Sequence, residues 1–214
     1  MSTAAPPTLM REVLALLGGL LLEGAATGLL DELRAEQVFA RSSSAAGGPL
    51  GAALGAAQAS LDEADSNALA TEYTRLFILP AGGPRGRLVI PPWEDCWLGE
   101  ERTVLGERSR AAMLAYAGAG IGFDAMDERP SDHLGLELCF VSALLVEEEA
   151  GERDGAARRA FVREHVQRFA PLIGAALARE SREPFWRALG DALTALPDPL
   201  ARLDAGALPV VMAN

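Results

Sequence analysis

Hydrophobic side chains in the first third of the chain recur at the spacing of amphipathic helices. The pattern predicts a first helix over about residues 8–28, with Thr8 as its N-cap. A second helix is expected over residues 29–41. A short alanine-rich helix should cover residues 50–59, after a break rich in serine, glycine and proline. The apolar face of the first helix comprises Leu9, Val13, Leu16, Leu17 and Leu20.

The next predicted helix is clearer, and Asp65 or Ser66 caps it. Its apolar residues at helical spacing are Leu69, Tyr73, Leu76 and Phe77. Such a pattern is more often core than binding surface. Glu72 is expected to be solvated or to pair with Arg75. Residues 80–92 then form a loop rich in Gly and Pro, and a loop of this length is more often functional than accidental.

The second half of the chain contains the most apolar predicted helix. After a helix over about residues 104–119, residues 123–131 read as a linker with turn chemistry. The following helix, residues 132–150, is capped by Ser131 or Asp132. It is apolar around most of its circumference, which predicts a central, buried helix.

Two further helices complete the pattern. One covers about residues 155–178, and the last begins at Pro184 and ends before Pro197. The composition agrees, because Ala and Leu are abundant whereas the usual strand formers are sparse. We therefore predict an all-α fold, a helical bundle of two subdomains joined by a hinge. The expected division is residues 1–122, a hinge at 123–131 and residues 132–214.

The charge of the chain limits its partners. The formal net charge is −11 at pH 7. An acidic surface repels phosphate backbones, so nucleic acid is not an expected partner. The same charge suits a basic peptide, although it also simply favours solubility.

The N-terminal apolar run and the cysteines bear on location. Residues 13–22 are too few to span a bilayer, and Glu12 and Glu23 flank them where a signal peptide would have positive charge and small residues. Cys96 and Cys139 are isolated, as in a reducing compartment. We expect a cytoplasmic protein without stable membrane insertion.

One polar cluster could carry chemistry. His133 and Glu137 are four residues apart on one helical face, next to Asp132. They could form a general acid–base pair, but no nucleophile, phosphate-loop or dinucleotide motif accompanies them. A metal site would require more ligands, and the chain has only one other histidine, His165. The alternative is structural: Asp132 caps the helix and His133 pairs with Glu137.

A second feature combines aromatic and acidic side chains. Trp93 and Trp97 flank Glu94 and Asp95 in the segment PPWEDCW. Such a surface could hold an apolar peptide with flanking positive charge. Two tryptophans four residues apart could equally pack into the core.

Four parts of the chain, in order between about residues 69 and 196, resemble motifs of the TorD/DmsD family of molybdoenzyme-maturation chaperones. The matching parts are residues 72–77 (E-Y-x-x-L-F), 91–93 (P-P-W), 128–138 (E-x-P-x-D-H-L-x-x-E-L) and the C-terminal segments 161–165 and 184–189. Two residues depart from the family pattern: Asp95 stands in place of the usual serine and Trp97 in place of tyrosine.

The resemblance implies a chaperone without catalytic activity or cofactor. Its expected partner is the catalytic subunit of a molybdopterin oxidoreductase of the DMSO/TMAO reductase type, bound through a twin-arginine leader or N-terminus for cofactor insertion and export proofreading. Asp132 and His133 match positions linked to leader binding, and Leu76, Phe77 and neighbouring residues match an apolar wall. The full expected peptide-binding set is Asp132, His133, Trp93, Pro92, Leu76, Phe77, Glu128, Glu137, Asp95 and Glu94.

Each half of such a leader has an expected contact. The arginine pair would meet carboxylates, and the apolar run would lie on the aromatic wall. Two alternatives remain: a small all-α enzyme that uses His133 with Asp132 or Glu137, and an assembly chaperone for a leaderless nitrate-reductase-type subunit. The sequence allows either a monomer or a dimer.

Overall fold

The computed structural model describes residues 7–24, 26–83, 86–122 and 129–203. Within these ranges the chain is helical, with isolated β-bridges but no strand, so the all-α prediction is confirmed. The elements are α1 (Pro7–Glu23), α2 (Thr27–Ala35), α3 (Val38–Ala46), α4 (Gly48–Glu63), α5 (Ser66–Tyr73), the π-helical η1 (Thr74–Ile78), α6 (Asp95–Leu98), α7 (Glu107–Ala119), α8 (Leu134–Glu149), α9 (Ala156–Phe161), the π-helical η3 (Val162–Val166), α10 (Gln167–Glu180), α11 (Pro184–Ala195) and α12 (Pro197–Arg202).

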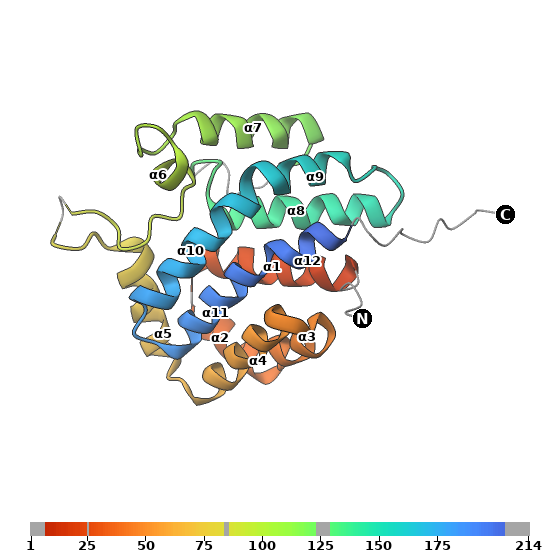
Figure 1. Cartoon of the computed structure of the whole chain (residues 1–214). Helices are drawn as coiled ribbons and strands as arrows, with labels where there is room; N and C mark the ends of the chain where they lie inside the picture. The colour runs from red at the N-terminus through yellow and green to blue at the C-terminus, as the bar shows by residue number, and fades with distance from the viewer. Residues whose placement is uncertain (1–6, 25, 84–85, 123–128, 204–214) are drawn as a thin grey trace.

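The helices are arranged around α1. It packs along α8, while α10 pairs with α11 and α11 packs on α4. Figure 1 shows α7 at one end of the molecule, α2 to α4 at the other end, and α1 and α8 between them. The described part of the loop between η1 and α6 extends outward from the side of the helical body.

A close crossing of α1 and α8 depends on glycine. A β-carbon at Gly18 would lie 2.9 Å from the carbonyl oxygen of Gly135, and one at Gly135 would lie 2.8 Å from that of Gly18. Neither distance is tolerable, so only glycine lets the two backbones approach this closely. The crossing holds the first turn of α8 against α1.

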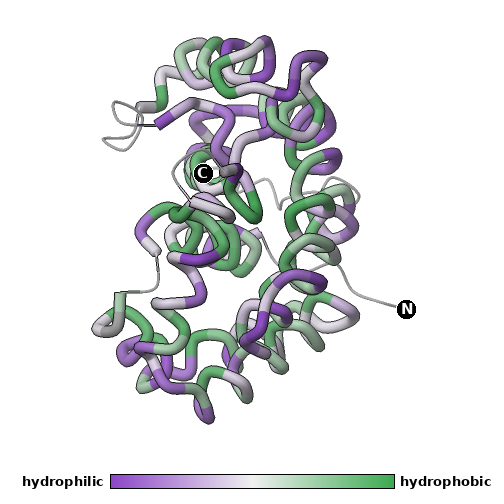
Figure 2. The backbone as a smooth tube through the Cα atoms, turned by 90° about the vertical axis from the view of Figure 1, so that its left-hand side faces the viewer, coloured by the Kyte–Doolittle hydropathy of each residue, from purple (hydrophilic) through white to green (hydrophobic). Residues whose placement is uncertain are grey.

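The core follows the predicted apolar positions. Figure 2 shows the most hydrophobic segments along the inner helices. The predicted central helix is confirmed, since α8 has buried residues on every side. The largest fully buried side chains include Trp186, Tyr116, Phe39, Phe140, Phe169 and Phe185.

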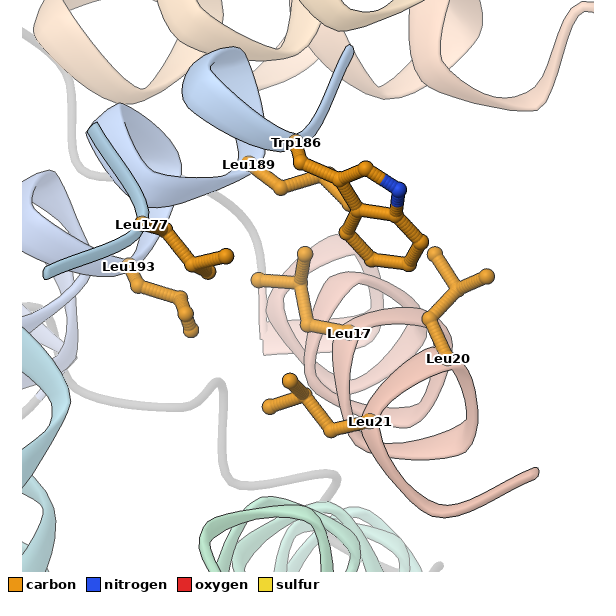
Figure 3. A pocket seen from close by; sticks show the side chains of 7 residues that line it. All are labelled: Leu17, Leu20, Leu21, Leu177, Trp186, Leu189 and Leu193. Atoms are coloured by element: carbon orange, nitrogen blue, oxygen red, sulfur yellow. The ribbon is translucent and has the colours of Figure 1, made fainter. Parts of the chain in front are cut away.

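A small void remains between α1, α10 and α11. Its volume is about 10 Å³, space for about one water molecule. Apolar side chains surround it: Leu17, Leu20, Leu21, Leu177, Trp186, Leu189 and Leu193 (Figure 3). Such a cavity offers a water molecule no hydrogen bonds, so we interpret it as a packing defect.

Helix boundaries differ from the prediction in several places; for example, α3 runs through the predicted serine-rich break to Ala46, and α4 begins at Gly48. α1 ends at Glu23 because Gly24 adopts a left-handed φ of 77°. The expected helix over residues 29–41 is broken at Gln37, whose φ is 50°. Pro197 opens α12 where we expected the helices to end, since proline fits the first turn of a helix.

Helices of the two predicted subdomains pack against each other: α1 contacts α8, and α4 contacts α11. Residues 123–128 of the expected hinge lie outside the described residues, so the division at 123–131 stays a prediction. Among the helices described, none combines the length and hydrophobicity needed to cross a bilayer.

Candidate functional site

The two strongest sequence motifs meet in space. Trp93 and His133 form an isolated antiparallel β-bridge. On either side of it, Glu94 N–H donates to the carbonyl of Asp132 and Leu134 N–H donates to the carbonyl of Pro92, both at 2.9 Å. In an extended pairing, alternate side chains point to opposite faces. The bridge therefore divides the motif residues into two sets. Trp93 and His133 form the outward-facing set, and Glu94 and Asp132 form the inward-facing set.

Asp132 belongs to the inward-facing set. It is fully buried, and its Oδ2 accepts a hydrogen bond from Asp95 N–H at 2.8 Å. Burial raises the pKa of Asp132 to about 6, although the hydrogen bond from Asp95 N–H partly offsets this. Its Oδ1 has no hydrogen-bond partner among the residues that the structure describes. Asp132 therefore fastens the 92–95 segment, and it does not cap α8 as one interpretation of the sequence expected.

Asp95 caps a helix that is distant in sequence. Its Oδ1 and Oδ2 accept hydrogen bonds from the backbone N–H groups of Arg108 and Ser109, at 3.1 and 3.0 Å. These groups lie in the first turn of α7, where amides lack intrahelical acceptors and the helix dipole favours a negative charge. The added carboxylate of the motif thus has a structural partner inside the protein.

His133 is the N-cap of α8. Its Nδ1 accepts a hydrogen bond from Gly135 N–H at 3.0 Å, so the remaining proton of the neutral ring is assigned to Nε2. Burial and then the charge of Arg129 lower the pKa of His133 to about 3. The expected pairing of His133 with Glu137 is wrong, because Glu137 faces a different set of groups.

Those groups are Glu94 and His165. The Oε2 of Glu94 lies 2.6 Å from Nδ1 of His165, and Oε1 of Glu137 lies 3.9 Å from the same nitrogen. Both carboxylates are fully buried. Burial and the nearby charge of Glu94 raise the pKa of Glu137 well above its usual range. Sequence spacing did not indicate this cluster, because His165 comes from η3.

The outward-facing set lines a half-open pocket of about 400 Å³. The rings of Trp93 and His133 meet edge to face, with centroids 6.5 Å apart. Ile78 lies at the rim with 55% of its surface exposed. The lining consists of Leu22, Tyr73, Phe77, Ile78, Leu88, Pro92, Trp93, Arg129 and His133.

The structure thus brings together only part of the expected peptide-binding set. Phe77, Pro92, Trp93 and His133 share the pocket, whereas Leu76 is fully buried behind it. Four carboxylates of the expected set have almost no exposed surface: Glu94, Asp95, Asp132 and Glu137. Glu128 lies outside the described residues.

The E-Y-x-x-L-F motif is buried, which confirms its prediction as core, and two of its residues, Tyr73 and Phe77, also form part of the pocket wall. Glu72 is buried, not solvated. It accepts hydrogen bonds from the side chain of Arg75 at 2.7 Å, which confirms the predicted Glu72–Arg75 pair, and from Arg182 N–H at 2.6 Å. Burial would raise the pKa of Glu72, but the hydrogen bonds from Arg75 and Arg182 outweigh it and lower the pKa. Tyr73 donates to the carbonyl of Leu21 at 3.0 Å.

Comparison with known proteins identifies the class to which this fold and its motif-bearing site belong. A family model described as the nitrate reductase delta subunit matches residues 44–174, more than half of the chain. The protein belongs to this family of NarJ/TorD-type chaperones, which confirms the predicted family.

One solved structure shares the fold over most of both chains. It is the crystal structure of a candidate redox enzyme maturation protein from Archaeoglobus fulgidus, with a TM-score of 0.56 and 23% sequence identity. The alignment covers 88% of this chain and 94% of that one. No curated protein sequence matches.

Proposed function

We propose that this chaperone binds the twin-arginine leader, or the N-terminus, of a molybdopterin oxidoreductase subunit of the DMSO/TMAO reductase type. It acts in the cytoplasm, holds the subunit for cofactor insertion and delays export, and it catalyses no reaction. One observation carries the proposal: the half-open pocket combines motif residues from three separate segments on one apolar, aromatic surface.

The chemistry of the pocket suits the apolar run of a leader. Its volume of about 400 Å³ accommodates several side chains of a peptide. Trp93, Tyr73 and Phe77 supply rigid aromatic surface, which loses little entropy on binding. Ile78, which is 55% exposed, extends the apolar surface to the rim of the pocket.

The two arginines of the leader would need contacts outside the apolar pocket. Of the carboxylates expected to meet them, Glu94, Asp95 and Asp132 are buried, and Asp95 and Asp132 accept hydrogen bonds from backbone N–H groups. Direct contact therefore requires the 92–97 segment to move away from residues 132–134. Under this proposal, the apolar run of the leader supplies most of the binding affinity while the 92–97 segment stays in place. The two arginines add to the affinity only after that segment has moved.

Calorimetric titration with a synthetic leader peptide tests the proposal. We expect micromolar binding by the native protein and at least about tenfold weaker binding by Ile78→Asp, because a charge would enter the apolar contact. Leu79→Asp is the matched control, since Leu79 is adjacent and as exposed but does not line the pocket. Equal affinities for the two variants would contradict the pocket assignment.

A peptide in which both arginines are replaced by lysine tests the second half of the proposal. Weaker binding of this peptide would support recognition of the guanidinium groups, because lysine cannot make bidentate contacts. Unchanged binding would show that the apolar run alone is recognised.

The family match favours a second candidate, a subunit of the nitrate-reductase type that lacks a leader. In that case the same pocket would accept the N-terminal segment of the mature subunit. A peptide with that sequence would then bind and the twin-arginine leader would not. The same Ile78→Asp and Leu79→Asp pair would show whether the pocket is used.

A further inference from the structure

We propose that Glu94, Glu137 and His165 form a binding site for one divalent transition-metal cation, for which Zn²⁺ is the reference ion. The site lies on the inner side of the Trp93–His133 bridge, apart from the peptide pocket. It does not depend on which partner the pocket accepts.

Three separate elements converge on this point. Glu94 immediately precedes α6, Glu137 lies in the first turn of α8, and His165 lies in η3. Each residue offers one ligand atom, and these atoms all lie within 4.8 Å of one another. Carboxylate oxygens and imidazole nitrogens are both ligand types that Zn²⁺ accepts, and zinc sites with three protein ligands are common.

Three carboxylate oxygens of the cluster lack hydrogen-bond donors among the residues described. Both oxygens of Glu137, and Oε1 of Glu94, have no hydrogen-bond partner within the described part of the chain. The guanidinium of Arg108 forms an ion pair with Glu94 Oε1 at 3.6 Å, a separation too long for a hydrogen bond, whereas Glu137 has no such guanidinium partner among the described residues. Buried carboxylates without partners are costly, so such a cluster normally contains a compensating cation.

A metal ion satisfies this geometry better than a proton does. A single proton on Glu137 leaves the second oxygen of that carboxyl group without a donor. A tetrahedral ion at the centre would place its ligand atoms roughly 3.4 Å apart. The 2.6 Å contact between Glu94 and His165 would widen and the 3.9 Å separation of Glu137 from His165 would narrow, both by less than a side-chain rotation allows.

One member of the cluster, His165, borders a solvent-accessible pocket, whereas Glu94 and Glu137 have no exposed surface. A pocket of about 260 Å³ between α7 and α9 has His165 in its wall. A water molecule from this pocket would complete four-coordination, as in zinc sites with three protein ligands. Arg108 has 24% of its side chain exposed and can turn outward when the ion neutralises Glu94.

Titration of chelator-treated protein with Zn²⁺, followed by calorimetry, tests the site. We expect one equivalent to bind and the unfolding temperature to rise. Glu137→Gln should weaken binding at least about tenfold. Glu164→Gln is the matched control, because Glu164 adjoins His165 but its side chain is 60% exposed. Absence of binding to the native protein, or full binding by Glu137→Gln, would overturn the proposal.

A second measurement keeps the test valid if Glu137→Gln fails to fold. X-ray absorption of the native protein loaded with one equivalent of Zn²⁺ should show one imidazole and oxygen ligands. Sulfur in the coordination sphere would instead place the ion at Cys96 or Cys139 and would overturn the proposal.

Discussion

Trp93 and Glu94 are adjacent in sequence, yet they face two different environments. Trp93 lines a half-open aromatic pocket beside the neutral ring of His133. Glu94 points into the interior, where it meets His165 and approaches Glu137. The antiparallel bridge separates the two sides. The family signature thus combines a surface and a buried acidic cluster, and a substitution acts differently according to the side on which it falls.

The largest expected effect is on the inner side, at Asp95. Asp95→Ala removes the acceptor of two amides in the first turn of α7. We expect the free energy of unfolding, measured with urea, to fall by about 3 kcal/mol. Glu101→Ala, an exposed change, should alter it by less than about 0.5 kcal/mol. A similar small effect for Asp95→Ala would mean that α7 is held by other contacts.

His133 should impose a pH dependence on stability. Its pKa is about 3 in the folded protein and 6.5 when unfolded, so the unfolded chain binds a proton that the folded one does not. This stability is present above pH 6.5 and is lost as pH falls. Between pH 6.5 and 5 the native protein should lose about 2 kcal/mol relative to His133→Asn, in which an amide oxygen can still cap α8.

The comparison with His133→Asn is necessary because the titration of Asp132 changes the stability in the opposite direction to the titration of His133. The raised pKa of Asp132, about 6, makes the folded protein less stable as pH rises between 3.8 and 6. Both proteins share this effect, so it cancels in their difference. Equal pH profiles for the two proteins would show that His133 is protonated in the folded state.

A smaller effect, of the opposite sign, is expected at Glu137. In metal-free protein, Glu137→Met replaces an unpartnered buried carboxylate by an apolar side chain of similar volume. Stability should rise by about 1–2 kcal/mol. The exposed control Glu164→Met should change little. A loss of stability in Glu137→Met would indicate that the carboxylate has a favourable partner without metal.

The two tryptophans should separate binding from stability. Trp97→Phe removes the hydrogen bond from Nε1 to the carbonyl of Pro91, which measures 2.8 Å, and should cost about 1 kcal/mol of stability. Trp97 does not line the pocket, so leader affinity should stay unchanged. Trp93→Ala should weaken leader binding about tenfold. The reverse result would exchange the roles of the two rings.

The helices were predictable because their apolar positions repeat locally. α8, for example, is apolar all round in sequence and buried all round in space. Its cap was not predictable, since His133 differs little in sequence context from Ser131 or Asp132. The break at Gln37 also lacks a signal, because a non-glycine residue there adopts a positive φ.

The aromatic part of the pocket followed from the family motifs, but the fate of the carboxylates did not. Asp95 caps α7 across a connection that no local pattern encodes. His165 reaches Glu94 across 71 positions of sequence. Contacts of this kind are set by how helices cross, and a single sequence contains no periodicity that reports them.

Photocrosslinking tests the central claim most directly. A twin-arginine leader with a photoreactive phenylalanine analogue in its apolar run would be irradiated with the native protein, and the linked residues mapped by mass spectrometry. The account predicts links to the pocket, at Phe77, Ile78 or Trp93. Links confined to exposed apolar side chains elsewhere, such as Met113 and Leu114 on α7, would contradict it.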